Sequence, residues 1–161
     1  MATTEDRFAE QKERTVATLQ YEFPLASGTS ELPENTLAEL DGSDELTQLD
    51  HSGGDDDSGV DLFAVLRAED TYPYLDGLHY DRGGTEGTAT VYGKVLLELE
   101  DNTGDVAANY DLFETVYAVD NETVDPDQAD GSGGSLAPVG QVYDTFPDKG
   151  TVLVHVDGPI T

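Results

Sequence analysis

A run of alternating valines near the C-terminus constrains the fold of this chain more than any other feature. Residues 151–156 read TVLVHV, so the three valines share one side of an extended strand while the leucine and the histidine share the other. A shorter apolar run at 139–143 precedes it, and the residues between the two runs include Pro147 and Gly150, which favour turns. The pattern predicts a β-hairpin that closes a small β-barrel or sandwich.

Four other segments indicate further strands. Residues 17–23 alternate strictly between apolar and polar side chains, and residues 60–67 are almost continuously apolar, which is typical of a central strand covered on both faces. Residues 88–100 form the longest strand pattern, which Gly93 interrupts in the manner of a β-bulge. Residues 112–119 are the predicted return strand.

The remaining segments predict one helix and several loops. Residues 32–40 read LPENTLAEL, which predicts a short helix. Two acidic stretches at 41–59 and 120–135 contain several glycines and predict solvated loops. The expected fold class is therefore mainly β: a single small antiparallel β-barrel or sandwich at 17–161, preceded by an extended N-terminal arm at 1–16.

The charge balance is strongly acidic. The chain has 35 acidic and 7 basic residues, which gives a formal net charge of −28. One interpretation is adaptation to multimolar salt, where screening shortens the reach of charges to about 3 Å and carboxylates keep the surface hydrated. The other is an acidic face that mimics nucleic acid or binds a basic partner. Because acidic residues occur in every part of the chain, the pattern favours salt adaptation and a halophilic archaeal source.

Composition argues against several classes of function. There is no basic stripe to neutralise phosphates, so no nucleic-acid partner is expected. Cysteine is absent, which removes disulfides and thiolate metal sites. No apolar run approaches the roughly 18 residues of a membrane span, and no basic and apolar leader follows Met1. Neither a membrane partner nor a classical signal peptide is therefore expected.

No catalytic residue, metal site or cofactor is predicted, and the chain is not expected to be an enzyme. The three histidines are far apart in sequence, and nucleophile-elbow, P-loop and dinucleotide-binding motifs are absent. Residues 125–131 look like the start of a calcium loop, but Ala129 and Leu136 stand where ligands are required. Loose cation binding there or at 55–57 stays open, as does N-glycosylation at Asn121.

The layout of the C-terminal hairpin resembles that of a known family. Pro138, Val139 and Gly140 are followed by a short polar run and then by Gly150 and the alternating valines. This order resembles the C-terminal end of small head decoration (cement) proteins of tailed viruses. The chain differs from that pattern at 141–143, where small residues are usual, and in its long acidic loops. The predicted strands upstream fit the small barrel of such proteins.

The resemblance implies a structural virion protein of a haloarchaeal tailed virus, located on the capsid surface. Such a protein binds the outside of an icosahedral shell, commonly as a homotrimer, and stabilises it by bridging subunits of the major capsid protein. The contact residues expected for it lie in the N-terminal arm and in an aromatic loop: Arg7, Phe8, Lys12, Arg14, Tyr72, Tyr74 and Tyr80. The tyrosines have an alternative role as a cap on the barrel.

Two other functions are compatible with the sequence. A tail-tube or turret subunit of the same kind of virus would also combine a β-domain with an arm that orders on a partner. A halophilic ligand-binding β-module or hydrolase would instead be a monomer with a pocket. The first alternative predicts stacked rings in virus particles, and the second predicts saturable binding of a small molecule or turnover.

Overall fold

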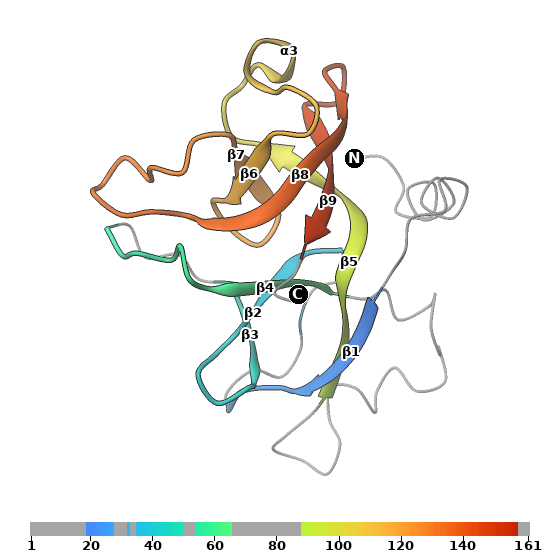
Figure 1. Ribbon diagram of the computed structural model, residues 1–161, viewed down its shortest axis with the longest axis vertical. Coiled ribbons are helices and arrows are strands. Elements are labelled where there is room, and N and C mark those ends of the chain that lie inside the picture. The colour runs from blue at the N-terminus through green and yellow to red at the C-terminus, as the bar shows by residue number, and fades with distance from the viewer. Residues whose placement is uncertain (1–18, 28–31, 33–34, 50–53, 66–87, 158–161) are drawn as a thin grey trace.

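The computed structural model describes residues 19–27, 32, 35–49, 54–65 and 88–157. In these ranges the chain forms nine β-strands and one short helix (Figure 1). Their bounds are β1 Leu19–Pro24, β2 Leu37–Leu40, β3 Leu46–Gln48, β4 Asp61–Val65, β5 Thr88–Asp101, α3 Val106–Asn109, β6 Thr115–Ala118, β7 Thr123–Asp125, β8 Ala137–Phe146 and β9 Thr151–Asp157. The predicted fold class, mainly β, is confirmed.

Five of these strands close into a barrel, in the order β5, β7, β6, β8, β9 and back to β5. β9 completes the ring because it pairs antiparallel with β8 on one side and with β5 on the other. The predicted C-terminal hairpin is confirmed, and its turn lies at 147–150, where Lys149 N–H donates to the Phe146 carbonyl at 3.0 Å. β8 continues beyond the predicted run, past a register shift at Tyr143.

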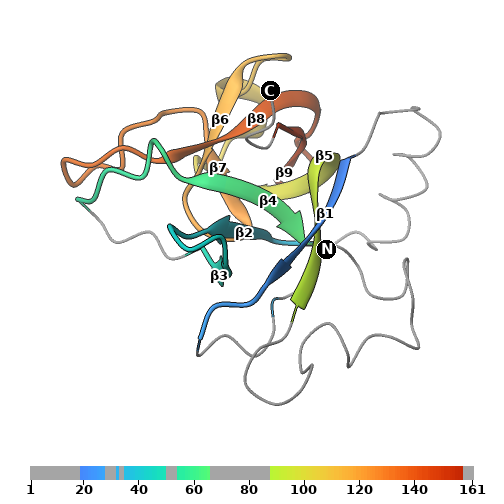
Figure 2. The ribbon, with the colours of Figure 1, turned by 60° about the horizontal axis from the view of Figure 1, so that its bottom comes forward.

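The other strands build a smaller sheet against the first half of β5. β3, β2 and β4 form an antiparallel three-stranded sheet, and β4 joins it to β5. β1 pairs with β5 as well, and a single bridge between Leu25 and Leu46 connects the end of β1 back to β3. Figure 2 shows β4 between the barrel strands and β2. The molecule therefore has two halves that share β5.

A bulge in β5 lies where this strand changes partners. Leu19 pairs with Lys94 and Gln20 with Tyr92, so Gly93 has no opposite residue on β1. Before this point β5 pairs with β1 and β4, and after it β5 pairs with β9. The bulge predicted at Gly93 is confirmed. A bulge bends its strand and increases the local twist, which lets one strand serve both halves.

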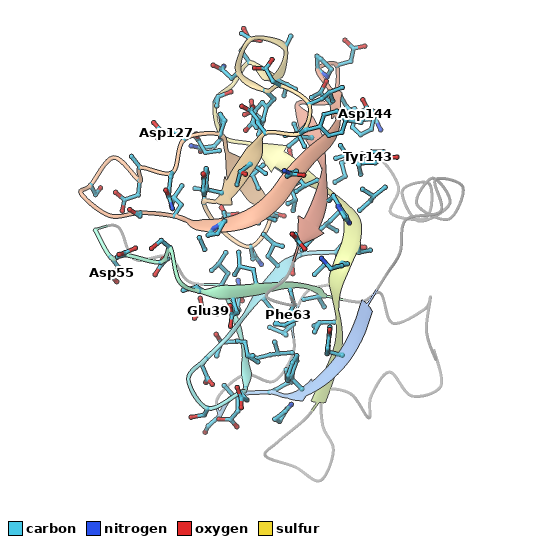
Figure 3. All side chains as sticks on the ribbon, viewed as in Figure 1. Glu39, Asp55, Phe63, Asp127, Tyr143 and Asp144 are labelled. Carbon is cyan, nitrogen blue, oxygen red and sulfur yellow. The ribbon has the colours of Figure 1, made fainter. Side chains whose placement is uncertain are left out.

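Each half has its own hydrophobic core, and β4 separates the two. Leu62 and Ala64 point into the barrel core, while Phe63 and Val65 point into the smaller core. The prediction of a strand covered on both faces is thereby confirmed for Asp61–Val65. Phe63, labelled in Figure 3, packs against the rings of Tyr21 and Phe23 at centroid distances of 5.7 and 5.3 Å. Full burial of one such side chain contributes about 2 to 3 kcal/mol.

The helix predicted at 32–40 is wrong, since β2 occupies Leu37–Leu40. Asn35 has φ of +62°, a left-handed conformation in which a right-handed helix does not continue. β2 also lies between β3 and β4, and hydrogen bonds to two neighbouring strands outweigh the modest helix propensity of the segment. The apolar spacing of Leu37 and Leu40 fits either structure.

Two further predictions need correction. The return strand predicted at 112–119 is shorter, because β6 covers only Thr115–Ala118 and the preceding residues form a turn after α3. Both predicted acidic loops contain a short strand: β3 lies within 41–59 and β7 within 120–135. β7 is part of the barrel, and its Val124 is completely buried. The predicted arm at 1–16 lies outside the described residues.

Candidate functional site

The seven predicted contact residues all lie outside the described residues, in 1–18 and 66–87. Their roles therefore stay predictions. They are Arg7, Phe8, Lys12, Arg14, Tyr72, Tyr74 and Tyr80.

An exposed turn at 111–114, which we term the aromatic turn, connects α3 to β6. Leu112 and Phe113 are 54% and 67% exposed, although both are large and apolar. Phe113 has φ of +69°, and a non-glycine residue in such a conformation costs on the order of 1 to 3 kcal/mol. The rest of the fold therefore holds an unfavourable backbone that keeps a phenylalanine in solvent.

Hydrogen bonds to β8 fix the aromatic turn. Phe113 N–H donates to the Val142 carbonyl at 2.8 Å, and Val142 N–H donates to the Glu114 carbonyl at 2.9 Å. The Glu114 carboxylate also accepts from Asp111 N–H at 2.8 Å, which closes the turn on itself. Tyr143, the third exposed large hydrophobic side chain among the described residues, follows directly on β8. Exposed apolar side chains close together on a surface are a candidate contact site.

Asp101, the last residue of β5, organises the loop between β5 and α3. Its carboxylate accepts from Thr103 N–H at 2.7 Å, from the Thr103 hydroxyl at 2.8 Å and from Gly104 N–H at 2.8 Å. Burial alone would raise the pKa of Asp101, but the hydrogen bonds that it accepts, first from Thr103 N–H, lower it overall. Asp105 caps α3 by accepting from Ala108 N–H at 3.2 Å.

Tyr110, the residue just before the aromatic turn, is anchored in the barrel. Its hydroxyl donates to the Val124 carbonyl on β7 at 3.0 Å, and the side chain is buried in the barrel core. Burial, followed by the nearby Asp101 carboxylate, raises the pKa of Tyr110 well above its usual range. The phenol therefore stays protonated and acts as a structural donor.

Two acidic loops from distant parts of the sequence lie side by side. Figure 3 labels one carboxylate of each, Asp55 and Asp127. Asp130 joins the loops, because its carboxylate accepts from Gly54 N–H at 2.7 Å and from Gly134 N–H at 2.9 Å. A second link runs from Asp57 N–H to the Ser135 carbonyl at 2.8 Å. We term residues 54–59 and 126–135 the paired acidic loops.

The carboxylates of the paired acidic loops serve mainly as acceptors for backbone N–H groups. Asp127 accepts from Ala129 N–H at 3.0 Å, and Asp125, the last residue of β7, accepts from Asp127 N–H at 2.8 Å. Hydrogen bonds from Ser58 lower the pKa of the exposed Asp56. Within the described ranges no group of three or more histidine, aspartate and glutamate side chains could hold a metal ion. The geometry of these loops is that of acidic turns.

His155 lies on β9, and the other two histidines of the chain lie outside the described residues. In the part of the chain that the structure describes, no helix combines the length and the apolar character needed to cross a bilayer.

The aromatic turn could not be found from the sequence. Leu112 and Phe113 stand in a run of apolar residues that predicts a strand, and local sequence does not show which apolar residues remain exposed. The acidic residues Asp111 and Glu114 on either side are the one signal of a turn, because aspartate favours turns and Glu114 closes this one.

Comparisons with protein-family models, with curated proteins and with solved structures found no match to this chain. The function is therefore inferred from the aromatic turn, the acidic surface and the resemblance of the hairpin.

Proposed function

We propose that this protein is a structural component of a haloarchaeal tailed virus that binds the outside of the icosahedral capsid. As a homotrimer on the capsid surface, it bridges neighbouring subunits of the major capsid protein and catalyses no reaction. The observation that supports this most is the aromatic turn, where Leu112 and Phe113 remain exposed on a backbone that the fold holds in a strained conformation. The resemblance of the hairpin supplies the identity of the partner.

High salt explains why an apolar contact suits this protein. The formal net charge of −28 gives strong self-repulsion in dilute buffer, whereas in multimolar salt the reach of charges falls to about 3 Å. Ion pairs across an interface then contribute little, while burial of apolar surface keeps its strength. Exposed side chains such as Leu112 and Phe113 are therefore the groups that can hold a partner.

The small binding free energy expected from one aromatic turn fits a contact that is made in several copies. Full burial of Leu112 and Phe113 contributes about 1.5 to 3 kcal/mol for each side chain, which is weak for one subunit. A trimer that places three such turns on a shell multiplies the effect, because the second and third contacts form within one complex. Weak single contacts with strong combined binding are what a shell-bridging protein needs.

Electron microscopy with gold-labelled antibodies against the barrel tests the proposal on virus particles from a haloarchaeal host whose virus encodes this chain. We expect label over the heads of intact particles. Label in regular rings along the tail would replace the proposal with a tail-tube subunit, and label at single vertices would replace it with a turret. Purified particles without label would contradict any role in the virion.

A second measurement addresses the third possibility, a free ligand-binding module. Light scattering coupled to size exclusion in roughly 2 to 3 M salt, a range where screening is nearly complete, gives the mass of the free protein. The proposal predicts a mass three times that of the chain. A strict monomer with a saturable small-molecule site would contradict it.

A further inference from the structure

One asparagine of the chain stands in the acceptor sequence for N-linked sugars. The four asparagines all lie in the described residues, at positions 35, 102, 109 and 121. Asn121 is the one that is followed two positions later by a serine or threonine, in the order Asn121, Glu122, Thr123. The acceptor sequence requires this hydroxyl and a residue other than proline in the middle. Because such a sequence also arises by chance, the environment of the side chain has to decide whether it is a site.

The other three asparagines have side chains that the fold engages or buries. Asn102 Nδ2 donates to the Asp125 carboxylate at 2.9 Å. Asn109 Nδ2 donates to the Asp105 carbonyl at 2.9 Å. The Oδ1 atom of Asn35 is buried. None of these three amides is free to carry a large polar group.

The Asn121 side chain is free by contrast. Among the described residues, neither its amide nor the Thr123 hydroxyl takes part in a hydrogen bond. Both residues are partly exposed, and in this part of the chain neither has a side-chain polar atom that is buried without a partner. The nitrogen that would carry a sugar and the hydroxyl that the acceptor sequence requires are therefore both open to solvent.

The backbone around Asn121 is fixed even though its side chain is free. The residue lies in the turn between β6 and β7, where Val119 N–H donates to the Thr123 carbonyl at 2.8 Å. The Asn121 carbonyl accepts from Leu37 N–H at 2.7 Å, which ties the turn to the start of β2. The fold therefore holds Asn121 where the barrel meets the smaller sheet, and it does so without using the side-chain amide.

We propose that Asn121 is a site of N-linked glycosylation. The donor is an oligosaccharide that a membrane lipid carries through a phosphate or diphosphate group. Asn121 Nδ2 forms a bond to the anomeric carbon of the sugar while the bond from this carbon to the phosphate oxygen breaks. The lipid phosphate leaves with the electron pair of that bond, and the amide nitrogen releases one proton to solvent. The transfer needs neither an oxidant nor a reductant.

The site and the proposed function stand on separate observations. The acceptor is defined by the turn between β6 and β7, whereas the capsid role is inferred from the aromatic turn and the hairpin. N-linked transfer takes place on exported chains, so the proposal includes export of this chain from the cytoplasm. The two proposals can fail separately, because one is measured on a single peptide and the other on whole virus particles.

Mass spectrometry of peptides from the protein isolated from its native source tests the site. We expect the peptide with residues 121–123 to be heavier than its sequence by the mass of an oligosaccharide, and fragment ions should place the addition on Asn121. The peptides with Asn102 and Asn109 should have the masses of their sequences. An unmodified peptide at 121–123, or a sugar attached to a different residue instead, would overturn the proposal.

Three variants expressed in the same host separate directed transfer from unselective attachment. Asn121→Gln removes the acceptor, Thr123→Ala removes the required hydroxyl, and Thr123→Ser keeps it. We expect complete loss of the added mass in the first two variants and its retention in the third. Because these side chains make no hydrogen bond within the described ranges, all three variants should fold, which circular dichroism in high salt checks. Added mass that persisted in Asn121→Gln or Thr123→Ala would contradict the proposal.

Discussion

Gly140 is a residue whose identity the fold dictates. A Cβ atom at this position would overlap the carbonyl oxygen of His155 and lie 2.9 Å from the carbonyl carbon, and both atoms belong to the backbone of β9. The strands of the hairpin cannot move apart without opening the barrel. The lack of space for a Cβ atom therefore explains why glycine stands at this position, which is also part of the family resemblance of the hairpin.

Gly140→Ala should lower the free energy of unfolding by about 3 kcal/mol or more, because the clash is with the backbone and no side chain can yield. Urea denaturation in high salt measures this change. Gly42→Ala is the matched control, since its Cβ would meet nothing within 4 Å, and its effect should stay within about 0.5 kcal/mol. Equal effects of the two substitutions would contradict the close approach of β8 and β9.

Asp101 gives a prediction with a defined pH dependence. Asp101→Asn should cost about 1 to 3 kcal/mol at pH 7, because the three hydrogen bonds from Thr103 and Gly104 lose their charged acceptor. Its pKa is lowered in the fold, so its stabilising contribution is complete above the unfolded value of about 3.9 and disappears as the pH falls through the folded value.

The difference between the natural chain and Asp101→Asn should therefore shrink when the pH is lowered from 7 to about 2. Thermal unfolding at constant salt measures it, with Asp111→Asn as an exposed control whose effect should be small throughout. A difference that stayed constant with pH would show that the carboxylate charge does not stabilise this loop.

Among the elements, the paired acidic loops are joined by one side chain, Asp130, and by the backbone bond from Asp57 to Ser135. Asp130→Ala removes the acceptor for Gly54 N–H and Gly134 N–H, so the loops should loosen at Gly54 while the Asp57–Ser135 bond and the barrel stay intact. Hydrogen exchange at these two amides should accelerate, and the free energy of unfolding should fall by about 1 to 3 kcal/mol. Asp127→Ala, which removes only a local bond to Ala129 N–H, should leave Gly54 protected.

The elements that could be predicted from sequence are those whose pattern is local. The hairpin of β8 and β9 follows from alternating valines and a turn of Pro147 to Gly150. β2 could not be predicted, because Leu37–Leu40 fits helix and strand alike and its pairing with β4 is decided far along the chain. β7 could not be predicted either, since three residues within an acidic stretch carry too short a signal.

The candidate site was less predictable than the fold. The sequence indicates that aromatic side chains and cations are available for contacts, but the residues it singled out lie outside the described ranges. The aromatic turn depends on φ of +69° at Phe113 and on bonds to Val142, both of which result from the closed barrel. Whether an apolar side chain stays exposed depends on the assembled fold, and the hydrophobic periodicity of the sequence does not reveal it.

At the scale of the whole molecule, β5 makes the two halves one unit. It contributes Val91 to the smaller core and Val95, Leu97 and Leu99 to the barrel core, with the bulge at Gly93 between them. The aromatic turn lies in the barrel half, between α3 and β6 (Figure 1). A rigid barrel holds the turn at a fixed orientation, as the proposed bridging of shell subunits requires.

Binding to the shell tests the central claim most directly. The natural protein and a Leu112→Ser, Phe113→Ser variant are mixed with shells assembled from the major capsid protein of the same virus, in about 2 to 3 M salt where charges are screened. Gln48→Ser, an exposed change on β3, is the control. Sedimentation should show the natural protein and the control on the shells, with the double variant bound at least about tenfold more weakly. Equal binding of all three proteins, or none by the natural one, would contradict the account.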